Sequence, residues 1–314
     1  MTDDQSGFIG RKLAKYLRVV KSLAVSFGFG AVVSYGLQRA TARLKIRLEI
    51  DHTGQIARTN YSGVLETISG DRGISRELLS WGEHEPLTTK LLNDVVKDTF
   101  VCVDIGANLG YYSVLEGKRA KKGFLIAIEP FDQSAKALKM NLIRNGISNS
   151  RVFQIAISDH DGEGYLLVGE RSNLNHLVLE KPEEDIKAQI VLVRKLDSII
   201  QEINLPRVDL LRMDVEGSEG RIYSGGRMTI SRFHPLILME VHVGVMGNLN
   251  THRLIEQMKM DGYETFYCIP READFRPFSI FCSSRRCSAD FLIGRLDENL
   301  VPACFNMLAV PAAR

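Results

Sequence analysis

Four acidic or imidazole side chains stand where two predicted strands end, near residues 213 and 241. Asp214 and Glu216 follow the first strand, and Glu240 and His242 close the second. The carboxyl ends of parallel strands meet at one edge of an open α/β sheet, so we expect these groups to line a ligand site. There they can take a proton from a hydroxyl group or hold a divalent cation. A structural role stays open for each: capping a helix, holding loops together or, for the histidine, hydrogen bonding in the core.

A second group of polar residues and glycines follows an earlier apolar strand, residues 101–105. Asp104, Gly106, Asn108 and Gly110 form a strand end, a turn and the start of a helix. Glycines that bracket a turn indicate backbone passing close to another group, and a ligand is the first candidate. Cys102, inside the strand, is expected to be a small core residue.

Two nucleotide-binding loops do not fit this turn. The dinucleotide fingerprint Gly-x-Gly-x-x-Gly requires glycine where the chain has Asn108 and again where it has Tyr111. A phosphate loop would need Lys and Ser or Thr after Gly110, but two tyrosines follow. Phosphate is therefore not the evident target.

The acidic end of the next strand indicates a different ligand. Glu129 follows the apolar residues 124–128 and is placed to accept hydrogen bonds from two ribose hydroxyls. The amides of the turn would attract a carboxylate, and Asp104 or Asp214 can pair with an ammonium group. S-adenosylmethionine carries all of these groups, and we predict it as the cofactor.

The residues around the turn resemble the first motif of the FkbM family of S-adenosylmethionine-dependent methyltransferases. That motif reads Asp-Ile-Gly-Ala-Asn-Leu-Gly-Tyr-Tyr-Ser from Asp104. Further matches follow in the family's order, at 129–130, 156–159, 196–198, 213–219 and 240–242. The resemblance covers roughly residues 73–295. Lys195 departs from the family, where many relatives have threonine, and this leaves the cofactor assignment intact.

The resemblance implies a fold and a set of cofactor contacts. The fold is α/β, a Rossmann-like class I methyltransferase domain whose sheet has seven mostly parallel strands, the last of them antiparallel. Asp104, Gly106, Asn108 and Gly110 would surround the methionine end, Glu129 the ribose, and Ile157 or Ser158 the adenine. Glu85, in the segment Trp-Gly-Glu-His-Glu, would cap the cofactor, although a solvent-exposed acidic turn is an equal interpretation.

Apolar periodicity and turn residues supply the remaining elements. Helices are predicted at 88–96, 108–121, 131–144, 196–203 and 251–260. Strands are predicted at 101–105, 124–128, 151–157, 208–213 and 235–241, with additional ones at 165–168 and 190–193 and a final pair at 263–269 and 289–294. We divide the chain into a helical extension (1–50), a lead-in segment that caps the cofactor site (51–99), the methyltransferase domain (100–295) and a C-terminal tail (296–314).

The first fifty residues differ from the rest. Residues 8–21 are predicted to form a basic amphipathic helix. The uncharged stretch of about 17 residues that follows is at the lower limit of length for crossing a bilayer and is weakly apolar, so we do not predict a transmembrane span. A signal peptide is a poor match. Two interpretations remain: an extension that packs on the main domain, or an interfacial segment, residues 8–47, held on anionic lipid.

Composition sets wide limits. The 314 residues are 45% hydrophobic and 25% charged with a net charge of +2, which is typical of a globular protein and gives no support for nucleic acid as a partner. Five cysteines in no metal-ligand spacing indicate neither a disulfide framework nor a zinc site, so we expect a reducing, cytoplasmic location, with peripheral membrane contact as a variant of it.

We therefore predict an O-methyltransferase that uses S-adenosylmethionine and acts on a hydroxyl group of a sugar, glycolipid or secondary metabolite. Positioning of the acceptor is worth about 7 to 11 kcal/mol, more than a general base contributes. No resident metal is predicted, although the carboxylates leave a metal-assisted mechanism open. Two alternatives are a dinucleotide-dependent oxidoreductase and a non-catalytic, membrane-associated adaptor that retains the fold.

Overall fold

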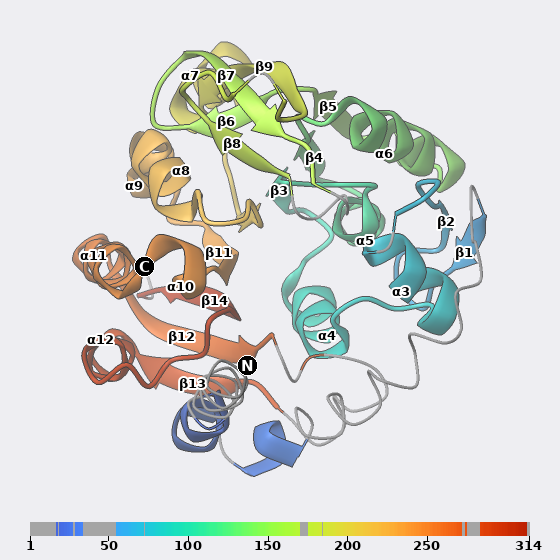
Figure 1. The fold of residues 1–314 in the computed structure, drawn as a ribbon. Coiled ribbons are helices and arrows are strands. Elements are labelled where there is room, and N and C mark those ends of the chain that lie inside the picture. Colours follow the sequence, from blue (N-terminus) through green and yellow to red (C-terminus); the bar gives the residue numbers. More distant parts are fainter. Residues whose placement is uncertain are drawn as a thin grey trace, which may run out of the picture.

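The apolar runs of the sequence form the strands of one large central sheet (Figure 1). The computed structural model describes residues 17, 19–27, 29–33, 55–71, 73–169, 175–183, 185–271, 274 and 283–312. In spatial order the strands are β13 (Arg285–Ser288), β12 (Tyr263–Pro270), β14 (Phe305–Pro311), β11 (Leu236–Val241), β10 (Leu210–Met213), β3 (Val101–Ile105), β4 (Phe124–Ile128) and β5 (Ser150–Phe153).

The directions of these strands confirm the class I methyltransferase fold. The five strands from β11 to β5 run parallel to one another, whereas β14 is antiparallel to both of its neighbours, β11 and β12. The mostly parallel sheet with an antiparallel last strand is the predicted arrangement. The described residues contain eight strands in this sheet instead of seven, because β13 pairs with the outer edge of β12.

Helices cover both faces of the sheet, because alternate residues of its buried strands point to opposite sides. On β3, Val103 and Ile105 pack against one set of helices and Cys102 against the other. The first face is covered by α7 (Leu196–Glu202), α8 (Glu219–Gly225), α9 (Arg227–Phe233), α11 (Asn248–Met260) and α12 (Ala289–Asp297), with the short α10 (Val243–Met246) following β11. The second is covered by α3 (Ile74–Trp81), α4 (Pro86–Val95), α5 (Tyr111–Arg119) and α6 (Asp132–Arg144).

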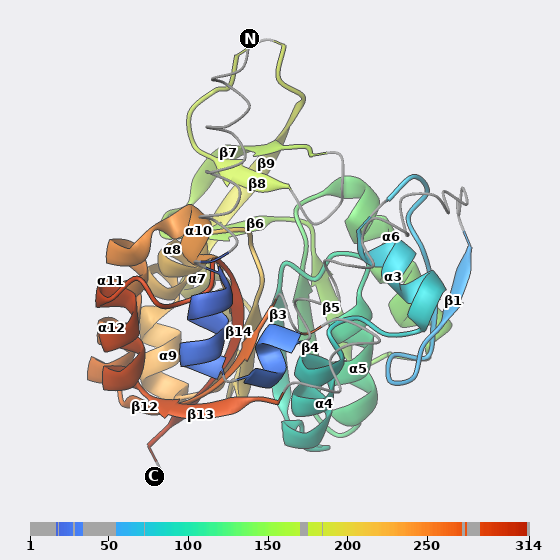
Figure 2. The ribbon, with the colours of Figure 1, turned by 60° about the horizontal axis from the view of Figure 1, so that its bottom comes forward.

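A second sheet of four strands lies beside the central sheet and projects away from the central sheet in Figure 2. Its order is β6 (Ala156–Ser158), β9 (Ala188–Lys195), β7 (Gly162–Leu167) and β8 (His176–Val178). The additional strands predicted at 165–168 and 190–193 are thus confirmed. The single strand predicted at 151–157 is wrong: the chain leaves the central sheet after β5 and enters the second sheet at β6.

The lead-in segment contains a hairpin and two helices. The strands β1 (Ile56–Arg58) and β2 (Val64–Glu66) pair antiparallel, and α3 and α4 follow them. The N-terminus of α4 is capped from far along the chain. The buried carboxylate of Asp274 accepts hydrogen bonds from the backbone N–H groups of Leu87 and Thr88, at 2.8 and 3.0 Å. The helix predicted at 88–96 is therefore confirmed and is anchored to the C-terminal half.

Two expectations for the C-terminal part are wrong. The strand predicted at 289–294 is the helix α12, in which Leu292 and Leu296 are buried one turn apart and the Ser288 hydroxyl accepts a hydrogen bond from the N–H of Phe291. The predicted tail, 296–314, contains β14, which lies inside the central sheet between β11 and β12. The sheet therefore extends well beyond the boundary placed at residue 295.

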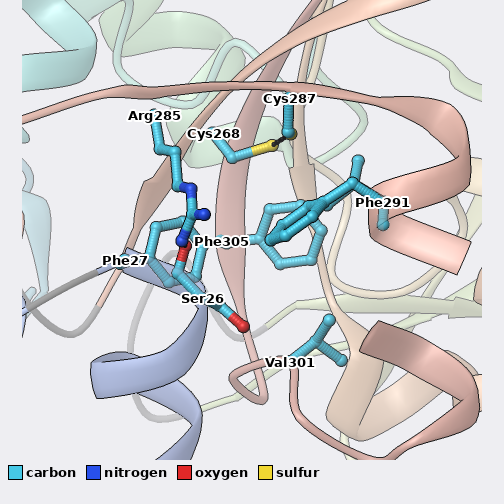
Figure 3. A pocket seen from close by; sticks show the side chains of 9 residues that line it. Ser26, Phe27, Cys268, Arg285, Cys287, Phe291, Val301 and Phe305 are labelled. Carbon is cyan, nitrogen blue, oxygen red and sulfur yellow. Dashed lines mark hydrogen bonds between the residues drawn. The ribbon is translucent and has the colours of Figure 1, made fainter. Parts of the chain in front are cut away.

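Part of the N-terminal extension is helical and packs on the domain. Residues 19–27 and 29–33 are helical. The Ser26 hydroxyl donates to the carbonyl of Leu300, and the Arg285 guanidinium donates to the carbonyls of Val25 and Ser26. Figure 3 shows Ser26 and Phe27 closing a small apolar pocket that Cys268 and Cys287 also line. These contacts support the packing interpretation for this part of the extension, while most of the basic residues of the predicted amphipathic helix lie outside the described residues.

None of the described helices combines the length and the apolar character that crossing a bilayer requires. Contact of residues 8–47 with a lipid surface stays a prediction.

Candidate active site

The turn after β3 is held tightly against the neighbouring strands. Gly106 has a φ of +78°, and a Cβ at this position would lie 2.0 Å from the backbone oxygen of Asp214. The N–H groups of Gly106 and Ala107 both donate to the carbonyl of Ile128, at 3.0 Å. The close group that the sequence indicated at Gly106 is therefore the backbone of the loop after β10, which fixes the turn relative to Asp214.

The turn continues through two further residues with positive φ. Asn108, at +49°, is a residue type that tolerates the left-handed region, and Gly110, at +94°, begins α5. A Cβ on Gly110 would lie 2.8 Å from the side chain of Leu138 on α6. Packing against α6 thus requires the second glycine, and the backbone path past Asn108 is fixed from both ends.

Glu129 stands beside the turn, as predicted. Its Oε2 accepts a hydrogen bond from the N–H of Asn108 and its Oε1 from the N–H of Phe131, both at 2.8 Å. Burial raises the pKa of Glu129 to about 7, although the two amide hydrogen bonds act in the opposite direction. Each carboxylate oxygen has a second lone pair, so the group can still accept one hydroxyl hydrogen on each side.

Asp104 and Asp214 are joined by an arginine that was not among the predicted site residues. Arg212, on β10, donates to Asp104 Oδ1 at 2.8 Å and to Asp214 Oδ2 at 3.0 Å. The other oxygen of Asp104 accepts from the hydroxyl of Ser113, at 2.5 Å. Asp104 is fully buried and bonded on both oxygens, so its clearest role is to hold Arg212 and the turn. The Asp214 side chain is more exposed and faces the site.

The two residues predicted to contact the adenine lie on β6. Ile157 is part of the apolar core that α7 and α8 cover, and Ser158 is fully buried, with its hydroxyl 3.1 Å from Asp159 Oδ1. Both side chains therefore contribute to packing, and contact with a cofactor stays a prediction for them.

The catalytic candidates gather around one imidazole ring at the ends of β10 and β11. His242 Nδ1 lies 2.6 Å from Oε1 of Glu219, and its Nε2 lies 3.3 Å from Glu216 Oε2 and 3.8 Å from Glu240 Oε2. Glu219, at the start of α8, is fully buried, whereas the side chain of Glu216 is 23% exposed. We refer to this group as the His242 cluster: Asp214, Glu216, Glu219, Glu240 and His242.

Protonation in the His242 cluster bears on the two roles that the sequence left open for the histidine, a base or a hydrogen-bonded structural residue. Burial opposes the charged ring, but the hydrogen bond to Glu219 and the charge of Glu240 outweigh it and raise the pKa of His242 to about 10. Burial, with the charge of Asp214, raises the pKa of Glu216 to about 7. At neutral pH the ring is an imidazolium without a free lone pair. Of the two, Glu216 is the better proton acceptor.

Glu240 links this cluster to the N-terminal half of the site. Its Oε1 lies 3.2 Å from Nε of Arg271 and accepts a hydrogen bond from the thiol of Cys304, at 3.0 Å. Burial and the charge of Asp214 raise the pKa of Glu240 well above its usual value. The same Arg271 nitrogen lies 2.6 Å from Oε1 of Glu85. One guanidinium therefore bridges the carboxylates of Glu85 and Glu240.

Glu85 belongs to a second histidine–carboxylate group, which we call the His84 cluster: Glu77, His84 and Glu85. His84 Nδ1 lies 2.6 Å from Glu77 Oε2, and Nε2 lies 3.7 Å from Glu85 Oε1. Glu85 Oε2 accepts from the Tyr112 hydroxyl, at 2.7 Å. Burial acts against ionisation of Glu85, but Arg271 and His84 outweigh it and lower the pKa to about 2. Glu85 is buried, so the exposed-turn interpretation is wrong, and its contact with a cofactor stays a prediction.

The structure thus brings together ten of the twelve predicted site residues: the turn, Glu129, Glu85 and the His242 cluster lie around one edge of the sheet. Three residues of the site, Arg212, Arg271 and Glu219, were not among the predicted ones. An arginine inside the otherwise apolar strand at 210–213 was a signal for a buried ion pair. Arg271 carried no such signal, because it acts through partners that lie far away in the sequence.

Comparison with known proteins agrees with this geometry. The family model described as "Methyltransferase FkbM domain" matches residues 104–265. Methyltransferase 1 of Beauveria bassiana is 24% identical, over 41% of this chain and 58% of that protein. The 2-O-methyltransferase NoeI of Sinorhizobium fredii is 28% identical, over 42% of this chain and 59% of that protein.

A solved structure, the methyltransferase FkbM from Methylobacillus flagellatus KT, is 17% identical, with a TM-score of 0.41 over 79% of this chain and 54% of that one. Each of these three matches spans less than two thirds of the related protein. The family model covers more than half of the present chain, including the turn and every member of the His242 cluster. The chain belongs to the FkbM methyltransferase family.

Proposed function

We propose that this protein is an S-adenosylmethionine-dependent O-methyltransferase. The observation that carries the proposal is the position of Glu129 against the glycine turn, at the ends of β3 and β4. A buried carboxylate that is fixed by two amides and has lone pairs to spare is suited to accept both hydroxyls of a ribose. In a methyltransferase family, the nucleoside with free hydroxyls on both ribose carbons is that of S-adenosylmethionine.

The charge of the site supports the same cofactor. Asp214 and the other carboxylates of the His242 cluster lie beyond the turn, on the side where the methionine end of such a cofactor would extend. An ammonium group and a sulfonium ion are both positive. A site with an excess of carboxylates therefore favours them, and it disfavours the pyrophosphate of a dinucleotide.

A hydroxyl acceptor follows from the proton-accepting group and from the relatives. Glu216 has a pKa near 7 and a partly exposed side chain, so it can receive the proton as the hydroxyl oxygen forms its bond to the methyl carbon. The electron pair of the broken sulfur–carbon bond stays on sulfur. The name of NoeI describes transfer to an oxygen, and we infer a hydroxyl of a sugar, glycolipid or secondary metabolite for this chain.

Calorimetric titration of the 314-residue chain tests the cofactor. We expect binding of S-adenosylmethionine and none of NAD. In the Glu129→Gln variant the affinity should fall by about 10- to 100-fold, since a hydrogen bond to a charged group is worth about 1.5 to 3 kcal/mol. The matched control is Glu163→Gln, on an exposed carboxylate of β7. Unchanged affinity in Glu129→Gln, or binding of NAD alone, would refute the proposal.

The acceptor is found by incubating the protein with radiolabelled cofactor and extracts of its own cells, then locating the labelled product. A labelled methyl ether is expected. A product labelled on nitrogen or carbon would refute the assignment to oxygen, and no labelled product would favour a non-catalytic adaptor.

A further inference from the structure

The proposed methyl transfer uses one proton acceptor, Glu216, whereas the atoms around His242 Nε2 offer a larger set of possible ligands. One ring nitrogen of His242 and one carboxylate oxygen each from Asp214 and Glu216 all lie within 4.8 Å of one another, and Nε2 is the nitrogen that lies 3.3 Å from Glu216. A second set, made of Glu240, His242 and Cys304, shares the same imidazole. The donors come from the ends of β10 and β11 and from the residue before β14, so adjacent strands of the central sheet hold them in place.

Glu219 fixes the direction in which the imidazole presents its second nitrogen. Its Oε1 accepts hydrogen bonds from His242 Nδ1, at 2.6 Å, and from the N–H of Gly217, at 3.2 Å. A carboxylate can only accept, so the proton resides on Nδ1 and Nε2 faces the other carboxylates. A buried carboxylate behind a histidine is the arrangement that orients imidazole ligands in metal sites.

Glu219 also provides an observation that is independent of the ligand set. The residue is fully buried, and its Oε2 has no hydrogen-bond partner among the described residues. A buried, unpaired carboxylate oxygen is costly unless a positive charge lies close by. The imidazolium of His242, 2.6 Å from Oε1, supplies that charge while the ring is doubly protonated, and a cation bound at Nε2 in place of the second ring proton would supply it instead.

The charges of the site leave room for a cation. Arg212 is shared between Asp214 and Asp104, and Arg271 is shared between Glu240 and Glu85. Among the described residues, no other arginine or lysine forms an ion pair with the carboxylates of the site. Two guanidinium groups and two imidazoles, those of His242 and His84, therefore face six carboxylates, which are Asp104, Asp214, Glu216, Glu219, Glu240 and Glu85.

We propose that Asp214, Glu216 and His242 Nε2 bind a divalent cation, which takes the place of the Nε2 proton of the imidazolium and releases that proton to solvent, with Glu219 as the positioning residue behind the imidazole. The proposal departs from the expectation that there is no resident metal, and it rests on the proposed function: the cation would hold the acceptor oxygen beside the cofactor. Metal coordination lowers the pKa of a bound oxygen, which helps a hydroxyl to lose its proton. Two carboxylates and one imidazole suit Mn²⁺ or a similar ion.

The test is a titration of the EDTA-treated, dialysed 314-residue chain with Mn²⁺, in which electron paramagnetic resonance measures the free ion. We expect one site in the wild type. Loss of a ligand in Glu216→Gln or His242→Asn should weaken the affinity at least tenfold, and Glu219→Gln should weaken it about 10- to 100-fold. The titration is repeated with S-adenosylhomocysteine present.

The chain offers a matched control for the ligand set. On the surface, His252 Nε2 lies 3.3 Å from Glu256 Oε1 and its Nδ1 lies 3.1 Å from Asp297 Oδ1, distances close to those around His242. His252→Asn and Glu256→Gln should leave Mn²⁺ binding unchanged. The proposal is overturned if the wild type takes up no Mn²⁺ at millimolar concentration under either condition, or if Glu216→Gln binds it as tightly as the wild type.

Failure of this proposal can be told apart from failure of the proposed function. The same preparation, in EDTA, is titrated with S-adenosylmethionine by calorimetry. Cofactor binding without Mn²⁺ binding rejects only the cation. Absence of cofactor binding, both in EDTA and with Mn²⁺ present, rejects the methyltransferase assignment itself.

Discussion

The His84 and His242 clusters are built alike and differ in how their charges are balanced. In both, a buried imidazole donates from Nδ1 to a glutamate at 2.6 Å and turns Nε2 toward further carboxylates. In the His84 cluster, Glu85 is also bound by Arg271, at 2.6 Å, and by the hydroxyl of Tyr112. Glu216, in the His242 cluster, has only the imidazole as a positive partner among the described residues. A carboxylate whose charge is balanced by an arginine, such as Glu85, stabilises the structure. A carboxylate without that partner, such as Glu216, is available to a ligand.

The pKa values express the same difference. Arg271 and His84 outweigh burial and lower the pKa of Glu85 to about 2, whereas burial and Asp214 raise the pKa of Glu216 to about 7. Residue type does not separate the two, since each is a glutamate beside a buried histidine. What separates Glu85 from Glu216 is the position of Arg271. Its Nε lies 2.6 Å from Glu85 and 3.2 Å from Glu240, so Glu85 is its nearer partner.

The largest expected effect on stability comes from breaking the His84 cluster. Glu85→Gln removes the charge that pairs with Arg271 at the shorter distance, and it replaces the charged acceptor of the Tyr112 hydroxyl with a neutral amide oxygen. Removing one partner of a buried ion pair costs about 3 to 5 kcal/mol of unfolding free energy. Chemical denaturation, with Glu216→Gln as the matched variant, measures it. If Glu85→Gln and Glu216→Gln lower the free energy of unfolding by the same amount, the two clusters do not differ in how their charges are balanced.

Addition of Mn²⁺ should act on the other cluster only. At a concentration 100 times the dissociation constant, a cation that binds only the folded state stabilises it by about 2.7 kcal/mol. Thermal unfolding of the wild type should therefore shift upward with Mn²⁺ and return after EDTA. Glu77→Gln, in the His84 cluster, should keep this shift and Glu216→Gln should lose it. A shift that survives in Glu216→Gln would place the ion elsewhere.

The pH dependence of stability should separate the clusters by its sign. The folded-state pKa of Glu216 is raised from 4.5 to about 7, so its contribution is complete below pH 4.5 and is lost as the pH rises through 7. That of Glu85 is lowered to about 2, so its contribution is present above pH 4.5 and is lost as the pH falls toward 2.

Denaturation series in EDTA across these pH ranges measure the two contributions. We expect about 1 to 2 kcal/mol for Glu216, since one pKa unit corresponds to about 1.4 kcal/mol and partial exposure screens part of the shift. Glu216→Gln should flatten the neutral limb and Glu85→Gln the acidic limb. If Glu216→Gln flattened the acidic limb and Glu85→Gln the neutral limb, our description of which carboxylate has its charge balanced by an arginine would be reversed.

The smallest effect is expected at the surface pair of His252 and Glu256. Its distances resemble those of the His242 cluster, but Glu256 is 55% exposed. Exposed ion pairs contribute about 0 to 1 kcal/mol, so Glu256→Gln should change the unfolding free energy by less than about 0.5 kcal/mol. A larger change would mean that distance, and not burial, governs these groups.

The part of the fold that surrounds the glycine turn could be predicted from the sequence. The β-branched strand before Gly106, the acidic end of β4 and the polar end of β10 are local signals, and the structure places them together. The C-terminal elements could not be predicted in the same way. Residues 289–294 are an apolar run that is compatible with a strand or a helix, and only the packing of Leu292 and Leu296 decides for α12.

The charge balance of the site was beyond sequence reasoning. The motif at 213–219 indicated acidic residues, but not that Glu219 would sit behind His242 or that Glu216 would lack an arginine. Arg271 and Asp274 reach partners on the loop before α4 and on its first turn, which are more than 180 residues away. Such pairings depend on the order of strands in the sheet, which places β12 beside β14 and one strand away from β11.

The central claim is that methyl transfer takes place at the His242 cluster while the His84 cluster supports the structure. Its most direct test is the transfer of radiolabelled methyl groups from S-adenosylmethionine to a cell extract by the wild type, Glu216→Gln and Glu77→Gln, each with its unfolding free energy. We predict that Glu216→Gln loses transfer about 100-fold, within the range that a general base contributes, and keeps its stability. Glu77→Gln should keep transfer and lose stability. Transfer that survives in Glu216→Gln and fails in a stably folded Glu77→Gln would contradict the account.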